Sequence, residues 1–159
     1  MKKIIVTLTF LVITQTFSFA QLKTSSSFGF RYIMPTDATA DAYDNGWGLT
    51  GTSNFDIIPI LGITVVGSWS TLSGKDALVD DQGNIIYAND LSIIGFTAGP
   101  YIKLGFLDLG VKGGYYFDDI HEWVILPFAE IDFWKISIGG EYKATEDVKW
   151  FSAYLNYNF

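Results

Sequence analysis

The residue types that most often perform catalysis are scarce in this chain. Among its 159 residues one is histidine and none is cysteine, so thiol chemistry and disulfides are absent. His121 stands beside Glu122 in a predicted loop, and a serine hydrolase would need a serine and an acid converging on it. No serine lies near His121 in the sequence or on the adjoining strand face. Zinc sites draw mainly on Cys and His. The sequence therefore predicts no catalytic, cofactor-binding or metal-ligating residues and no enzyme activity.

Carboxylates are abundant, and many of them fall in the predicted loops. The loop acids are Asp37, Asp41, Asp44, Asp76, Asp80, Asp81, Asp90, Asp118, Asp119, Glu146 and Asp147. Oxygen ligands at this density could hold Ca²⁺, or bridge to lipopolysaccharide through divalent cations, but no segment has the twelve-residue spacing of a calcium-binding loop. We interpret these residues as a solvated rim.

The charge balance excludes one class of partner. Acidic residues outnumber basic residues by seventeen to ten, which gives a net charge of −7. Binding to nucleic acid depends largely on Lys and Arg neutralising phosphates. We therefore expect no nucleic-acid partner.

The amino terminus has the organisation of a secretory signal peptide. Lys2 and Lys3 precede an apolar run from Ile4 to Ile13, and Ser18 and Ala20 form a small-x-small end. The apolar run is too short for a transmembrane helix, which needs roughly twenty apolar residues. No cysteine follows the site, which excludes a lipid-anchored lipoprotein. We expect residues 1–20 to be removed after Ala20, leaving one domain over residues 21–159.

Side chains alternate along the last twelve residues, Val148 to Phe159. Odd positions from Phe151 to Phe159 are apolar or aromatic, and the even positions are largely polar. This period of two predicts a strand with one apolar face. Seven further segments show the same pattern: Thr24–Met34, Gly46–Phe55, Ile60–Leu72, Leu91–Lys103, Phe106–Phe117, Glu122–Phe133 and Trp134–Tyr142.

The connections between these eight segments are alternately longer and shorter. The longest, Ser73 to Asp90, contains Asp81-Gln-Gly-Asn84, which is typical of a hairpin turn. Short turns at one end and longer loops at the other are typical of membrane barrels. The sequence predicts an all-β protein, an eight-stranded antiparallel up-and-down transmembrane β-barrel in which Val148–Phe159 pairs with Thr24–Met34.

We expect the apolar face to point outward into lipid. Three tryptophans lie on that face beside the long loops, as in an interfacial belt, namely Trp47, Trp69 and Trp123. The opposite face is rich in glycine and in ionisable residues. Confined charges must pair, because an unpaired one is costly. We predict a salt-bridge network drawn from Arg31, Asp108, Lys112, Glu130 and Glu141 that plugs the lumen; a gated ion path is the alternative. Pro127, in mid-strand, predicts a bulge or a shifted register.

The leader, the eight strands and the terminal Tyr157-Asn-Phe159 resemble the small outer-membrane β-barrels of Gram-negative bacteria, of the OmpA/OmpX type. The resemblance implies location in the cell outer membrane and contact with membrane lipid and lipopolysaccharide. It also implies recognition of the closing strand by the barrel assembly machinery, through Phe151, Leu155, Tyr157 and Phe159.

We expect a monomer with a structural or adhesive role, in which the loops, chiefly Ser73 to Asp90, make the contacts. Two alternatives remain open at this point. One is a narrow channel for ions or small solutes. The other is a secreted soluble barrel that binds a small apolar ligand.

Overall fold

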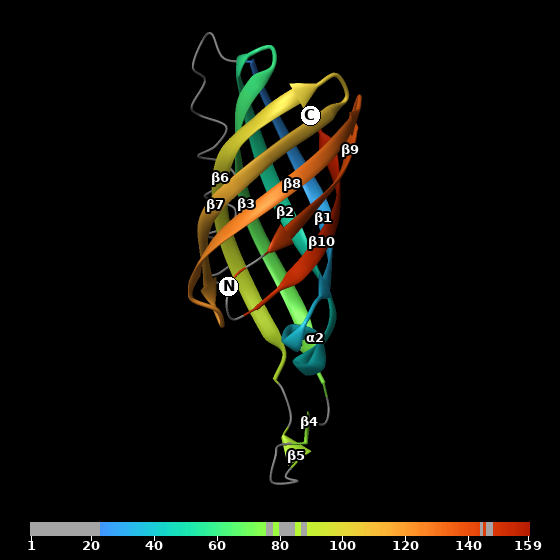
Figure 1. Cartoon of the computed structure of the whole chain (residues 1–159). Helices are drawn as coiled ribbons and strands as arrows, with labels where there is room; N and C mark the ends of the chain where they lie inside the picture. The colour runs from blue at the N-terminus through green and yellow to red at the C-terminus, as the bar shows by residue number, and fades with distance from the viewer. Residues whose placement is uncertain (1–22, 76–77, 80–84, 87–88, 144, 146–147) are drawn as a thin grey trace, which may run out of the picture.

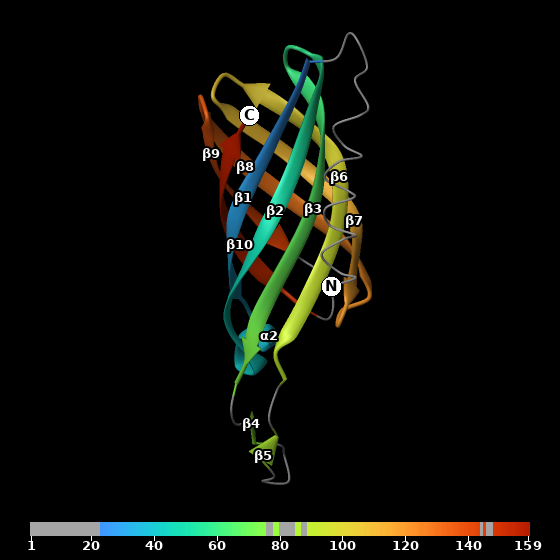
Figure 2. The same ribbon diagram turned by 180° about the vertical axis from the view of Figure 1, so that it is seen from behind.

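Eight antiparallel strands close into a barrel in a computed structural model that describes residues 23–75, 78–79, 85–86, 89–143, 145 and 148–159 (Figures 1 and 2). The barrel strands are β1 (Lys23–Pro35), β2 (Tyr43–Ile58), β3 (Leu61–Gly74), β6 (Leu91–Leu104), β7 (Leu107–Asp118), β8 (Glu122–Phe133), β9 (Ile136–Lys143) and β10 (Trp150–Asn158). Each is bonded to its neighbours in the chain, and β10 closes the barrel against β1, where Phe28 pairs with Tyr157. The predicted fold class and closing pair are confirmed.

Strand bounds match the alternation closely. β8 begins and ends at the predicted residues, and most other ends differ by one or two. β2 differs most, because it runs from Tyr43 to Ile58 instead of from Gly46 to Phe55. A register irregularity between Tyr43 and Gly46 in its pairing with β3 breaks the period of two at this point. Alternation alone therefore placed the start of β2 too late.

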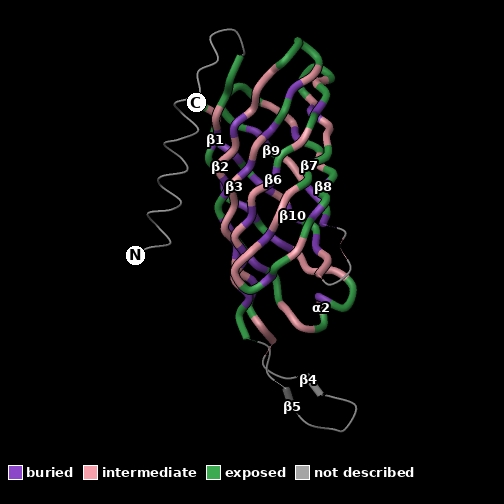
Figure 3. The backbone as a smooth tube through the Cα atoms, turned by 90° about the vertical axis from the view of Figure 1, so that its left-hand side faces the viewer, coloured by how far each residue is buried: buried purple, intermediate pink, exposed green. Residues whose placement is uncertain are grey.

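Alternate residues along each strand differ in burial, so buried and exposed segments succeed each other along the tube in Figure 3. Outward positions carry large apolar side chains on every barrel strand, among them Phe28, Leu49, Ile63, Ile102, Val111, Ile125, Ile138 and Leu155. A soluble protein rarely exposes so continuous an apolar surface. Lipid covers such a surface in a membrane barrel, which confirms the predicted outward direction of the apolar face.

The two prolines inside strands interrupt hydrogen bonding without shifting the register. Pro127 pairs with Val111 in an unbroken β7–β8 register, and the pairing of β8 with β9 begins one residue later, at Phe128. The missing N–H therefore falls beside the end of a ladder. The bulge and the shifted register predicted as alternatives at Pro127 are therefore both wrong. Pro100 occupies a gap in the β6–β7 ladder, which resumes in the same register at Tyr101.

Short and long connections lie at opposite ends of the barrel. At the turn end, two-residue turns join β2 to β3, β6 to β7, and β8 to β9, and the carboxyl terminus lies there (Figure 1). At the loop end, the short helix α2 (Ala38–Ala42) follows β1, and β4 (Leu78–Val79) pairs with β5 (Ile85–Ile86) beyond the barrel. This pairing confirms the predicted hairpin, whose turn lies outside the described residues.

The predicted signal peptide, residues 1–20, also lies outside the described residues and stays a prediction. In the part of the chain that is described, no helix is long and apolar enough to cross a membrane.

Candidate functional site: the closed lumen

A buried carboxylate shared by two cations lies inside the barrel. Glu141 of β9 forms an ion pair with the Arg31 guanidinium of β1 at 2.8 Å and accepts a hydrogen bond from the Lys112 ammonium of β7 at 2.5 Å. All three side chains are almost completely buried. Alternation directs them inward, and the narrow interior brings three different strands within reach of one another. This part of the predicted network is confirmed.

Asp108 and Glu130, the other two predicted members, lie inside the barrel but outside these salt bridges. They face each other across the β7–β8 pair and are only 4% and 7% exposed. Glu130 accepts a hydrogen bond from the Asn156 amide at 3.3 Å, and Asn156 accepts one from Thr50 at 3.2 Å. Among the described residues neither carboxylate forms an ion pair. Their predicted place in the salt-bridge network is therefore wrong.

A second ion pair lies toward the turn end. The Lys103 ammonium is 2.9 Å from Asp56, which also accepts the Tyr101 hydroxyl at 2.6 Å. Lys103 is the direct neighbour of Asp108 in the β6–β7 register. Its ammonium nevertheless lies against Asp56 of β2, so Asp108 keeps no direct counter-ion.

The loop-end half of the lumen is filled by an apolar cluster. Its buried residues are Ile33, Leu72, Leu91, Ile93, Tyr116, Ile120, Val124, Leu126 and Trp150. The rings of Tyr116 and Trp150 stack with centroids 5.7 Å apart. Lys143 lies 4.2 Å from the Trp150 ring centroid and forms an ion pair with Glu122.

We did not predict this plug from the sequence. A signal was present, because the inward positions become apolar as the strands approach the long loops, for example at Ile33 in β1 and Leu72 in β3. The overall polarity of the inward face obscured that change. The plug matters for function because apolar side chains close the lumen beneath the loops.

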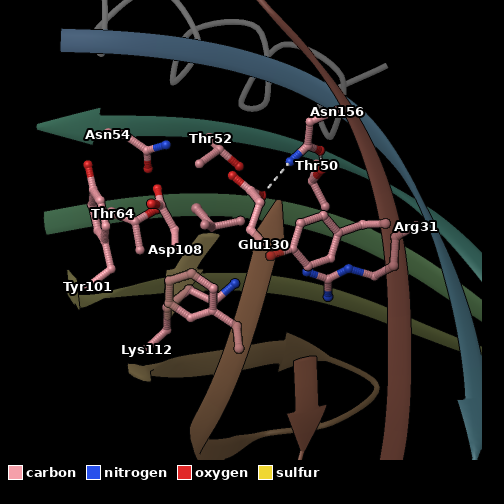
Figure 4. A pocket seen from close by; sticks show the side chains of 13 residues that line it. Arg31, Thr50, Thr52, Asn54, Thr64, Tyr101, Asp108, Lys112, Glu130 and Asn156 are labelled. Atoms are coloured by element: carbon pink, nitrogen blue, oxygen red, sulfur yellow. Dashed lines mark hydrogen bonds between the residues drawn. The ribbon is translucent and has the colours of Figure 1, made fainter. Parts of the chain in front are cut away.

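One small cavity remains between the plug and the turn end (Figure 4). Its interior is about 20 Å³, room for roughly one water molecule. The lining is mostly polar and comprises Arg31, Thr50, Thr52, Asn54, Thr64, Val66, Tyr101, Asp108, Lys112, Phe128, Glu130, Tyr154 and Asn156. A cavity of this size holds a single ion or water and no larger solute.

The first and last loops are bonded together over the loop end. Thr36 donates its amide to the Lys149 carbonyl at 2.9 Å, and the Lys149 amide donates to the Thr39 hydroxyl at 2.9 Å. The Lys149 ammonium also lies 3.4 Å from Asp37. These bonds place α2 beside the mouth of the barrel (Figure 1).

Several predicted rim acids have structural roles. Asp90 accepts the Gly74 amide at 3.0 Å, while Asp118 and Asp119 both accept hydrogen bonds from Ser92. Asp41 and Asp44 are exposed. Asp76, Asp80, Asp81, Glu146 and Asp147 lie outside the described residues.

His121 is exposed at the loop end, as the sequence indicated. Within the described ranges, no group of three or more His, Cys, Asp or Glu side chains is placed to hold a metal ion.

Solved structures with the same fold include two of Ail, the attachment invasion locus protein of Yersinia pestis. Ail in complex with the heparin analogue sucrose octasulfate is 17% identical, with a TM-score of 0.50 over 87% of this chain and 99% of Ail. The backbone structure of Ail in a phospholipid bilayer nanodisc is 15% identical, with a TM-score of 0.51 over 86% and 100%. A de novo designed transmembrane β-barrel is 14% identical, with a TM-score of 0.53 over 85% and 95%.

No protein-family model matches the chain, and no curated protein matches it in sequence. At such low identities the structural likeness shows the fold. The chain has the fold of small eight-stranded transmembrane β-barrels, the architecture of outer-membrane proteins such as Ail.

Proposed function

We propose that this chain is a non-enzymatic outer-membrane protein that acts at the cell surface through its loops. The observation that carries the proposal is the closed lumen. The apolar plug, the network around Glu141 and the pair Lys103–Asp56 fill it in succession, and the remaining cavity holds about one water. A filled lumen leaves the loop end to contact partners and the outer face to contact lipid.

The charge of the loop end indicates the chemistry of the partner. Asp41 and Asp44 are exposed there. Of the described lysines outside the lumen at this end, Lys75 donates a hydrogen bond to the Ala40 carbonyl and Lys149 forms an ion pair with Asp37. The negative potential of these exposed aspartates attracts cationic partners and repels anionic ones. The heparin analogue bound by Ail is anionic. We therefore expect the loop end of this chain to prefer a partner of the opposite charge. We propose a cationic protein surface, or lipopolysaccharide bridged by divalent cations, as the contact.

We further propose insertion as a monomer by the barrel assembly machinery. Support comes from the exposed apolar face of the closing strand, which consists of Phe151, Leu155, Tyr157 and Phe159. Outer membranes are extracted with detergent and run on a gel with and without boiling. A mobility change and recovery in the outer-membrane fraction are expected, and recovery in a soluble fraction would contradict the proposal.

Two binding assays test the proposed surface role. Purified protein in detergent is passed over immobilised heparin and over an immobilised basic peptide at low salt. We expect retention by the basic peptide alone, with retention reduced in the double variant Asp41→Asn/Asp44→Asn. Retention by heparin would contradict the assigned charge. Planar-bilayer recordings should show no steps of conductance, and regular steps would favour a channel.

A further inference from the structure

Two buried carboxylates face each other in the lumen, and among the described residues neither forms an ion pair. Asp108 and Glu130 are directly paired across β7 and β8, which places their Cβ atoms about 4.5–5.5 Å apart. Like charges directly opposite each other are destabilising. Asp132 lies near enough to act on both by its charge. This juxtaposition needs a compensating positive charge.

The neighbouring basic residues Lys103 and Lys112 act on these carboxylates through their charge, but neither forms an ion pair with them. Lys112 lines the same cavity, but its ammonium is 2.5 Å from Glu141, which it shares with Arg31. Lys103 is engaged with Asp56. In their ionised forms, two basic and three acidic side chains carry a summed charge of −1, namely Arg31, Lys112, Glu141, Asp108 and Glu130. Asp132 brings this sum to −2. The local excess is therefore about that of one divalent cation.

Asp108 carries the second observation. It is 96% buried and lines the cavity, and among the described residues nothing donates a hydrogen bond to it. A buried carboxylate without a partner is costly. Figure 4 shows Asp108 and Glu130 in the same cavity as Thr52, Asn54 and Thr64. Glu130 accepts hydrogen bonds from the Asn156 amide and the Tyr154 hydroxyl, so Asp108 is the less satisfied of the two carboxylates.

We propose that this cavity binds one Ca²⁺ ion between Asp108 and Glu130. The potential ligands are carboxylate, hydroxyl and amide oxygens, which suit a hard cation, and the cavity lining contains no Cys, His or Met. Mg²⁺ keeps several waters, for which a cavity of about 20 Å³ has no room. With two carboxylates as ligands, we expect the weak affinity of extracellular calcium modules, on the order of 10⁻⁴ to 10⁻³ M. The site is independent of the proposed surface role.

Calcium titration of the refolded, lipopolysaccharide-free protein in detergent tests the site. Protein stripped with EDTA is titrated with CaCl₂ by calorimetry, and its urea midpoint is measured with CaCl₂, MgCl₂ or NaCl at equal ionic strength. We expect one Ca²⁺ per chain and a higher midpoint with Ca²⁺ than with Mg²⁺ or Na⁺. Absence of binding up to 10 mM, a concentration about tenfold above the expected range, would overturn the proposal.

Matched variants separate this site from the acidic rim. Asp108→Asn and Glu130→Gln should each weaken Ca²⁺ binding at least tenfold, while Asp41→Asn/Asp44→Asn should leave it unchanged. Asp108→Asn should also raise the midpoint of the Ca²⁺-free protein, because it removes one of two opposed charges. Gel mobility without boiling verifies that each variant is folded. Unchanged calcium binding in both lumen variants, or its loss in the rim variant, would refute the site.

Discussion

Replacement of Glu141 by glutamine should test the energetic role of the lumen network. The substitution keeps the shape of the side chain and removes the carboxylate that contacts both Arg31 and Lys112. Breaking a buried pair by removing one partner costs about 3–5 kcal/mol, because an uncompensated charge stays buried. The Glu130 carboxylate also interacts electrostatically with Lys112, so it would partly balance the charge left without its partner. We therefore expect a loss of unfolding free energy near the lower value, about 3 kcal/mol.

Reversible urea unfolding in phospholipid vesicles or detergent, followed by tryptophan fluorescence, measures this change. The exposed rim variant Asp41→Asn is the matched control and should stay within about 0.5 kcal/mol of the wild type. A triple variant, Arg31→Met/Lys112→Met/Glu141→Leu, removes the whole network and should be close to neutral, since apolar replacements of buried ion pairs often are. If Glu141→Gln were as stable as the rim control, the network would be structurally dispensable and our reasoning wrong.

Three further predictions concern packing and assembly. Gly99→Ala places a Cβ against the Val111 carbonyl oxygen of the adjacent strand and should cost about 1–3 kcal/mol in urea unfolding. Gly113→Ala should be near neutral, because its Cβ would lie 3.9 Å from the Val124 carbonyl oxygen. Trp150→Ala removes the largest side chain of the apolar plug and should cost about 3–5 kcal/mol; a smaller loss would mean that the plug collapses around the gap. Removal of Tyr157–Phe159 should lower recovery of heat-modifiable barrel from outer membranes, and unimpaired recovery would contradict the role given to the closing strand.

The sequence was sufficient to predict the barrel because alternation is local. A period of two along β8, from Glu122 to Phe133, specifies both the strand and the face that meets lipid. Closure also followed from the pattern, since the first and last amphipathic strands pair as predicted, with Phe28 opposite Tyr157. Pro127 was a poorer guide, because its effect on the ladder depends on where the pairing with the next strand ends.

Partner choice within the lumen was less predictable because it depends on long-range geometry. Alternation directs Arg31, Lys112, Asp108 and Glu130 inward alike, but it does not specify their heights along the tilted strands. Cross-barrel distances decided that Glu141 meets both basic groups while Asp108 and Glu130 meet neither. A carboxylate and a cation on one inward face can pair only where tilt and stagger bring them level.

The apolar plug and the polar cavity together divide the lumen into two chemically different halves. Ile33 and Trp150 belong to the buried apolar cluster near the loops, so any water or ion passing from that end would have to displace apolar side chains. The cavity at Asp108 lies on the other side of this cluster, toward the turn end. An ion in that cavity would therefore exchange with the compartment at the turn end, and loop partners would not reach it directly. The proposed calcium site and the proposed contact surface consequently act on opposite sides of one seal, and each can be removed by mutation while the other is kept.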